Sequence, residues 1–130
     1  MNFEFECKPE NDIQPTEAFI ATFSFETNDN IEINYNFDFG MDKKEEDYII
    51  YGLDEEYSWN DFINGKTIKL CTDNNNTTNT VNFSIEEEYF NFKFEGGIDW
   101  ITRHNLRIKI TSEMREKIIS EFEKCKKYFE

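Results

Sequence analysis

The chain has 130 residues and a formal net charge of −14, from 28 acidic and 14 basic side chains. Fourteen phenylalanines, six tyrosines and two tryptophans are enough to form a packed interior, which argues against an intrinsically disordered chain. No run of eighteen apolar residues and no linker rich in proline, glycine or serine occurs, so the sequence predicts one domain over residues 1–130 and no membrane-spanning helix.

The first forty residues alternate apolar and polar side chains with the period of half-buried β-strands. Phe3, Phe5 and Cys7 are separated by glutamates, and residues 19–25 repeat the pattern with phenylalanine. Residues 30–39, NIEINYNFDF, alternate without a break, with amides or carboxylates at every even position. The turn residues 27–30 predict a hairpin between the last two segments.

The next region is less regular. Residues 41–57 hold two charged clusters around a short apolar run at 48–51, and here we expect a loop and an irregular strand. A short helix is expected from Ser58 to Asn64, ended by Gly65.

The second half predicts further strands and one longer helix. Strand patterns occur at 66–71, 81–85, 89–94 and 106–110, with a polar loop expected from Thr72 to Asn79. Apolar residues then recur every three or four positions, after a cap at Thr111 or Ser112: Met114, Ile118, Phe122, Cys125 and Phe129. The sequence therefore predicts an α+β fold, mainly an antiparallel β meander of about six to seven strands, with a C-terminal amphipathic helix packed on the sheet.

Motifs that carry chemistry are scarce. The single histidine, His104, is expected in a turn before a strand, and no cysteine pair has the spacing of a zinc or redox site. Residues 73–84 begin like a calcium loop but have Thr78 in place of the required glycine and Ser84 in place of the glutamate. We therefore expect no catalytic residue, no metal, no cofactor and no enzymatic activity.

Three widely spaced cysteines and the absence of a secretion signal in MNFEFECKPE predict reduced, buried thiols in a cytoplasmic protein.

The excess negative charge lies in one half of the sequence. Residues 1–65 carry seventeen acidic side chains against three basic ones, whereas residues 66–130 carry eleven of each. The negative electrostatic potential that these acidic residues produce attracts basic surfaces and repels nucleic acid and anionic membranes. Lysine and arginine do not cluster along the sequence outside the end of the C-terminal helix, so direct nucleic-acid binding is not expected.

Carboxylates interleaved with aromatic residues mark the candidate partner-binding segment. Tyrosine provides contact area at low entropic cost, and neighbouring carboxylates pair with lysine or arginine of a partner. The alternative is that the aromatic rings fill the core while the acids face water. The candidate partner-binding residues, which include two from the solvent-facing row of the 30–39 strand, are Asp47, Tyr51, Asp54, Glu55, Glu56, Tyr57, Asp61, Glu32 and Asp38.

These features favour a small acidic module that docks on a basic protein surface, such as a toxin or a nucleic-acid-binding protein. Immunity proteins, antitoxins and phage or viral anti-defence inhibitors share this compact, acidic character, and a nucleic-acid mimic is the sharper version of the hypothesis. Two alternatives stay open. One is a ligand-binding or enzymatic domain with an aromatic-lined pocket between sheet and helix. The other is an assembly subunit whose exposed strand edges pair between copies.

Overall fold

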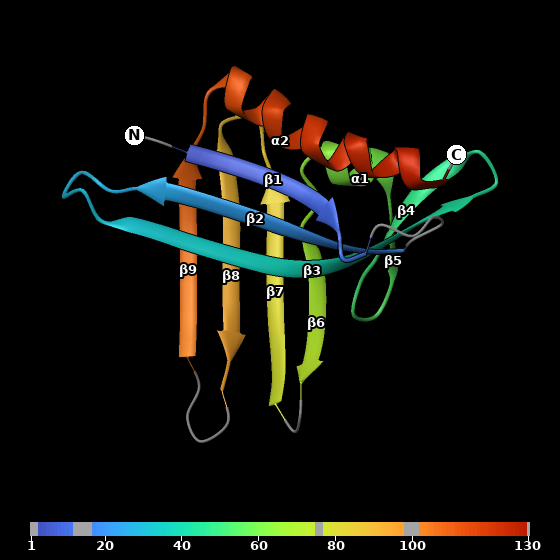
Figure 1. Cartoon of the computed structure of the whole chain (residues 1–130), viewed down its shortest axis with the longest axis horizontal. Helices are drawn as coiled ribbons and strands as arrows, with labels where there is room; N and C mark the ends of the chain where they lie inside the picture. The colour runs from blue at the N-terminus through green and yellow to red at the C-terminus, as the bar shows by residue number, and fades with distance from the viewer. Residues whose placement is uncertain (1–2, 12–16, 75–76, 98–101, 130) are drawn as a thin grey trace.

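The computed structural model describes residues 3–11, 17–74, 77–97 and 102–129, which form two antiparallel β-sheets and a C-terminal helix (Figure 1). The first sheet has five strands in sequence order, β1 (Phe3–Pro9), β2 (Ala18–Glu26), β3 (Glu32–Lys44), β4 (Asp47–Tyr51) and β5 (Glu56–Ser58). The second sheet has four, β6 (Ile68–Asn74), β7 (Thr77–Ile85), β8 (Tyr89–Gly96) and β9 (Thr102–Lys109). A short helix, α1 (Trp59–Ile63), connects the two sheets.

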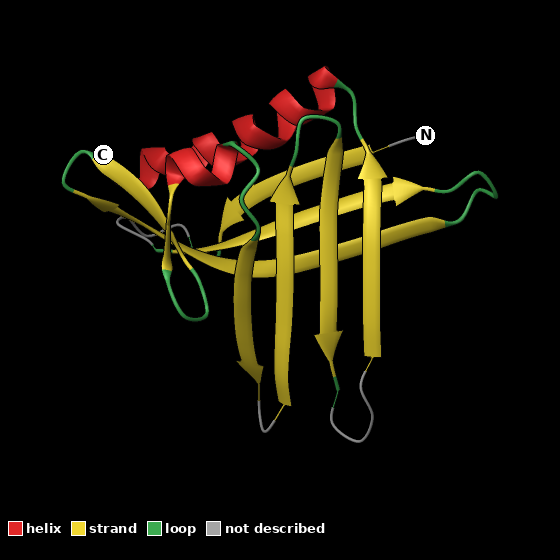
Figure 2. Ribbon diagram, turned by 180° about the vertical axis from the view of Figure 1, so that it is seen from behind, coloured by secondary structure: helices red, strands yellow, loops and turns green. Residues whose placement is uncertain are grey.

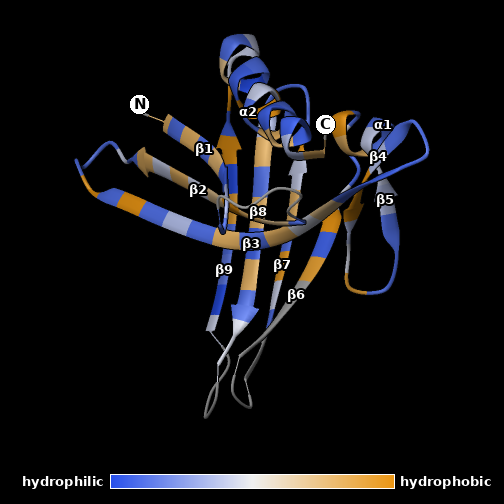
Figure 3. Ribbon diagram, turned by 45° about the vertical axis from the view of Figure 1, so that its right-hand side comes forward, coloured by the Kyte–Doolittle hydropathy of each residue, from blue (hydrophilic) through white to orange (hydrophobic). Residues whose placement is uncertain are grey.

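The two sheets pack face to face, with the strands β1–β3 running across the strands of the second sheet (Figures 1 and 2). Alternation puts one side of each strand into the interface, and Figure 3 shows the resulting bands of hydrophilic and hydrophobic residues along β3. The buried side chains of both sheets belong to one contiguous cluster dominated by phenylalanine. Phe23 lies at its centre, with its ring centroid 5.1 Å from that of Phe90 and 5.0 Å from that of Phe92.

Helix α2 (Ser112–Lys124) runs beside β1 and closes one side of this interior (Figure 1). The Thr111 side chain caps its N-terminus by accepting a hydrogen bond from the backbone N–H of Met114 (3.2 Å). Phe122 of α2 is fully buried, and its ring packs against aromatic rings of both sheets and of α1. The short 3-10 helix η1 (Cys125–Phe129) follows and buries Cys125.

The edge strand β1 is covered by a charged residue of α2. The backbone N–H of Cys7 donates to Glu121 Oε1 (3.3 Å), while Oε2 of the same carboxylate accepts from the ammonium group of Lys124. Glu121 is 8% exposed, so the helix provides a buried acceptor for an edge group that would otherwise lack a partner.

The predicted α+β class, the antiparallel strand order and the C-terminal helix on the sheet are confirmed. The strand number was underestimated, since the described residues form nine strands in two sheets. The main reason is that residues 41–57 are not mainly loop: β3 continues to Lys44, and β4 and β5 extend the first sheet. The helix at Ser58–Asn64 is found as α1, with Ser58 as its N-cap.

Two other local expectations were wrong. The polar segment Thr72–Asn79 contributes to both β6 and β7, so the loop between these strands is much shorter than expected. His104 lies inside β9 rather than in a turn, paired in register with Phe94. No helix among the described residues has the length and apolarity needed to cross a membrane.

Candidate functional site

An acidic groove of about 550 Å³ lies where β1, β2, β3 and β4 of the first sheet approach β6 of the second. Its carboxylates come from Glu10, Glu17 and Asp38, and Tyr51 forms part of its wall. The remaining lining residues are apolar or glycine: Ala18, Phe39, Gly40, Gly52, Leu53 and Leu70. None of the described residues that line the groove is basic.

Backbone pairing brings these distant residues together. Glu10, just after β1, donates its N–H to the carbonyl of Ala18 (3.0 Å), and the carbonyl of Glu17 accepts from Met41 of β3 (2.9 Å). The N–H of Leu53 donates to the carbonyl of Lys69 in β6 (2.8 Å), which holds the segment after β4 against the second sheet. The groove is therefore fixed by hydrogen bonds on both of its sides.

Glu10 and Asp38 form a close pair of carboxyl groups. Burial, together with the negative charge and hydrogen bond of Asp38, raises the pKa of Glu10 above its ordinary value of 4.5. Two like charges at short distance disfavour double ionisation, and a positive charge placed between them removes this cost. The pair therefore favours a cation in the groove.

Tyr51 is oriented by a third acid. Its phenol donates a hydrogen bond to Asp42 Oδ2 (2.8 Å), and this bond, with burial and the charges of Asp42, Glu17 and Glu56, raises the pKa of Tyr51 to about 12. The ring lies over Gly40, its register partner in β3, where an added Cβ would be 3.1 Å from the tyrosine ring. The glycine thus lets the ring lie flat on the strand beside the groove.

Leu53 adds an apolar contact at the groove margin. It is 42% exposed, one of two large hydrophobic residues exposed to this degree within the described part of the chain. Phe39 and Leu70, by contrast, are nearly fully buried and form a closed apolar floor. A groove with acidic walls and an apolar floor suits a side chain with an alkyl stem and a charged end.

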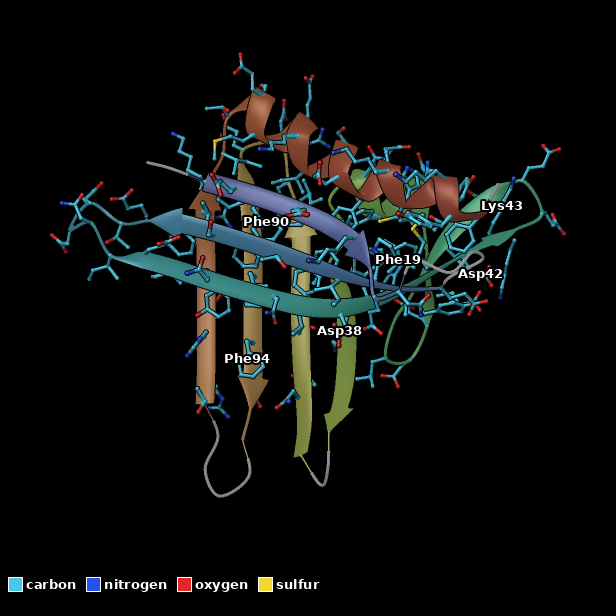
Figure 4. All side chains as sticks on the ribbon, viewed as in Figure 1. Phe19, Asp38, Asp42, Lys43, Phe90 and Phe94 are labelled. Carbon is cyan, nitrogen blue, oxygen red and sulfur yellow. The ribbon has the colours of Figure 1, made fainter. Side chains whose placement is uncertain are left out.

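The structure brings two of the predicted site residues, Asp38 and Tyr51, together in this groove (Figure 4 shows Asp38 on β3). Three others lie on the neighbouring β5–α1 corner and have cationic partners there. Glu56 pairs with Lys44 (2.5 Å), while Glu55 and Asp61 both approach Lys66 (3.8 and 4.0 Å). The negative potential of this corner is therefore partly neutralised within the chain.

The remaining predicted residues lie apart from the groove. Asp47 and Asp54 are exposed, and Asp47 accepts the backbone N–H of Tyr48 (2.8 Å). Glu32 lines a separate groove that also contains Lys117 and Lys124 of α2. Tyr57 is 5% exposed and accepts the N–H of Lys69 with its phenol oxygen (3.3 Å), so its ring belongs to the core.

Sequence reasoning missed Glu10 and Glu17, which no local pattern marks as functional. It also did not predict that strand register would place several cations on the same side of the second sheet. We define the basic face as the solvent side of β6–β9, where alternation and register place Lys69, Lys93, Arg103, Arg107 and Lys109 on one side of the sheet, together with Glu95. Period-two spacing within each predicted strand was the available signal.

The single histidine does not line the groove. His104 Nδ1 is hydrogen-bonded to the phenol of Tyr35, and its ring is exposed at the margin between the sheets. No group of three His, Cys, Asp or Glu side chains among the described residues could hold a metal ion.

Three comparisons with known proteins, by family models, by curated sequences and by solved structures, found no match to this chain.

Proposed function

We propose that this protein is a small acidic binding module whose groove receives a lysine or arginine side chain from a basic protein partner, as a stoichiometric inhibitor would. The observation that carries the proposal is the groove itself: three carboxylates over an apolar floor, with no basic residue among its described lining residues. The groove is a more specific basis for the proposal than the uneven charge distribution of the sequence, because it identifies where a partner side chain would bind.

The chemistry favours arginine over other cationic groups. A guanidinium can pair with carboxylates through several N–H donors at once and can stack on the ring of Tyr51. Its alkyl stem would lie on Phe39 and Leu70, with Leu53 covering it from the margin. Closing the groove in this way removes water from the ion pairs, which strengthens them.

The packed interior lends less support to a pocket between sheet and helix. The ring of Phe122 in α2 lies 5.1 Å from that of Phe39 and 4.8 Å from that of Phe62, centroid to centroid. At these distances the rings are in direct contact and occupy the region where such a pocket would lie.

Charge reversal in the groove tests the proposal directly. Glu17→Lys with Asp38→Lys changes the net charge from −14 to −10, and so does the control Glu87→Lys with Glu88→Lys on exposed residues before β8. A third variant, Glu55→Lys with Glu56→Lys, makes the same change at the lysine-paired corner. The groove reversal, Glu17→Lys with Asp38→Lys, should weaken partner binding by on the order of tenfold, while the Glu87/Glu88 control pair changes it little.

A defined probe makes the test independent of partner identity. N-acetyl-arginine amide, titrated against the labelled protein and followed by nuclear magnetic resonance, should shift the backbone signals of Asp38, Tyr51 and Leu53. The citrulline amide, which has the same shape without the charge, should not. Partner capture from the host in a salt series then measures the full interface. Equal binding by the groove variant and the Glu87/Glu88 control would refute the groove as the site.

A further inference from the structure

The outer strand of the second sheet has an open edge. β9 is the last strand of the order β6-β7-β8-β9, and no strand of the described residues pairs with its outer edge. The ends of β2 and β3 extend past β9 in Figures 1 and 2, but they belong to the layer of the first sheet. It pairs with β8 over eight residues, and four consecutive residues, 102–105, are exposed. Every second backbone N–H and C=O group of an edge strand points away from the sheet, which is the template for adding another strand.

The side chains of this edge are cationic. Arg103, Arg107 and Lys109 lie on its solvent side, and no acidic residue occurs in β9. Glu95 pairs with Arg103 (3.2 Å) and Glu86 approaches Arg107 (3.7 Å), yet both arginine side chains are at least 60% exposed. Arg107 also stacks on the ring of Tyr89 at 3.9 Å from its centroid, which orients its guanidinium along the sheet surface.

The opposite side of the same strand is largely apolar. Leu106 is half-buried and Ile108 is buried, while His104 contacts Tyr35 and Phe94. A strand added next to β9 would therefore meet cations on one side and apolar or aromatic side chains on the other. Cross-strand neighbours interact most strongly when charges are opposite and apolar residues are paired.

We propose that β9 is a docking edge for an extended acidic segment of a partner protein, in which acidic and apolar residues alternate. The acids would face Arg103, Arg107 and Lys109, and the apolar residues would extend the inner row of Leu106 and Ile108. Backbone hydrogen bonds to β9 supply affinity. The alternation of acidic and apolar residues sets the register, because a shift by one residue would place the acidic side chains next to the apolar row. This site lies on the second sheet and does not depend on the acidic groove.

The cations of an edge strand have a simpler role, which is to prevent pairing between copies of the chain. This role predicts no affinity for an acidic strand, and it predicts self-association when the cations are removed. The two explanations therefore give opposite outcomes in the same set of variants.

The test uses a fluorescent peptide, acetyl-EVEVEVE-amide, and the full-length protein in fluorescence anisotropy. The peptide should bind, and the amides of β9 should become protected from hydrogen exchange when it is present. Arg103→Glu with Arg107→Glu should weaken binding by about tenfold or more. The control Lys8→Glu with Lys117→Glu makes the same charge change on β1 and α2 and should leave the affinity within about twofold, as expected for distant exposed charges.

Backbone pairing is separated from simple charge attraction by two further peptides. N-methylation of alternate residues removes N–H donors from one edge of the peptide, so of the two methylated registers one should lose binding and the other retain it. The proposal is overturned by equal loss in both registers, by binding without protection of β9, or by no binding at all. It is also overturned if the arginine variant self-associates while the wild-type protein ignores the peptide.

Discussion

The two sheets share an interior but differ in what they present to solvent. The outer side of β1–β3 carries the carboxylates Glu4, Glu6, Glu26, Glu32 and Asp38, together with Lys8, whereas the outer side of the second sheet is the basic face. In the second half of the sequence acidic and basic residues balance, so this basic face arises only when strand register sorts them. Net charge in a sequence segment is thus a poor guide to the charge of a folded face.

The two sheets also differ in how their edge strands are protected from pairing with other strands. The edge of β1 is covered by α2, with Glu121 accepting the Cys7 N–H, and the opposite edge of the first sheet is the three-residue strand β5. β9 has no comparable cover among the described elements and is eight residues long. Edge strands are protected by covering, by shortness or by charge, and only the last of these applies to β9. We infer that the first sheet is closed to strand addition and the second is not.

The largest effect is expected from two phenylalanines of the same strand. Phe90 and Phe94 point to the same side of β8, but Phe90 is fully buried among Phe3, Phe5 and Phe23, whereas Phe94 is only half-buried, below β3 in Figure 4. Phe90→Ala should lower the free energy of unfolding by about 3–5 kcal/mol, because it leaves a cavity between the sheets. Phe94→Ala should cost about 1 kcal/mol, since solvent reaches its site. Urea unfolding followed by circular dichroism measures both.

If Phe90→Ala and Phe94→Ala lowered the free energy of unfolding by similar amounts, the first sheet or a neighbouring segment would have to cover β8 along its whole length. The inner side of β9 next to Phe94 would then be covered as well, and the docking proposal for β9 would lose the apolar contacts that it expects there.

A smaller effect is expected at the covered edge of β1. Glu121→Ala leaves the buried N–H of Cys7 without its acceptor and should cost about 1–3 kcal/mol. Glu121→Gln keeps an acceptor oxygen and should recover most of that loss. Glu123 lies two residues after Glu121, is exposed and pairs with Lys126, so Glu123→Ala should change the free energy of unfolding by less than about 0.5 kcal/mol.

Hydrogen exchange gives the specific readout for this edge. In Glu121→Ala the Cys7 amide should exchange faster while the amides of β2 and β3 change little. If the alanine variant is as stable and as protected as the wild-type protein, α2 does not close the edge, and the contrast between β1 and β9 disappears.

Much of the fold could be predicted from local patterns, and the site mostly could not. Period-two alternation located the strands at 3–7, 19–25 and 30–39, and the cap at Thr111 located α2, because these signals lie within a few residues. The division into two sheets depends on the corner between β5 and β6, where α1 redirects the chain, and no periodicity encodes it. The short strands β4 and β5 were obscured by charged residues on their exposed sides.

The acidic groove was beyond sequence reasoning for the same physical reason. Glu10, Glu17 and Asp38 come together only through the register of β1, β2 and β3, which long-range backbone pairing sets. The predicted site included Asp38 and Tyr51 because both lie in acidic, aromatic-rich sequence. The same criterion also selected Tyr57, whose alternation with Glu56 and Ser58 turns it into the core.

The smallest expected effect concerns the pKa of Tyr51 beside the acidic groove. Tyr51 ionises at about 12 because its hydrogen bond to Asp42, burial and the surrounding carboxylates disfavour the phenolate. Asp42→Asn should therefore lower the pKa of Tyr51 toward 10, whereas Asp47→Asn, which removes a charge without contacting Tyr51, should leave it nearly unchanged. The ultraviolet absorbance of the phenolate, taken as the difference between each protein and its Tyr51→Phe counterpart, isolates this residue from the other five tyrosines.

The same group sets a pH dependence whose sign can be worked out. An unfolded tyrosine ionises near 10, so between about 10 and 12 the unfolded chain releases this proton while the folded chain retains it. The Tyr51 contribution to stability is therefore complete below pH 10 and is lost as the pH rises through 12. Asp42→Asn should narrow this window. If instead Tyr51 titrates near 10 in the wild-type protein, the carboxylates around it are screened by solvent, and the groove would offer an arginine far less than its geometry implies.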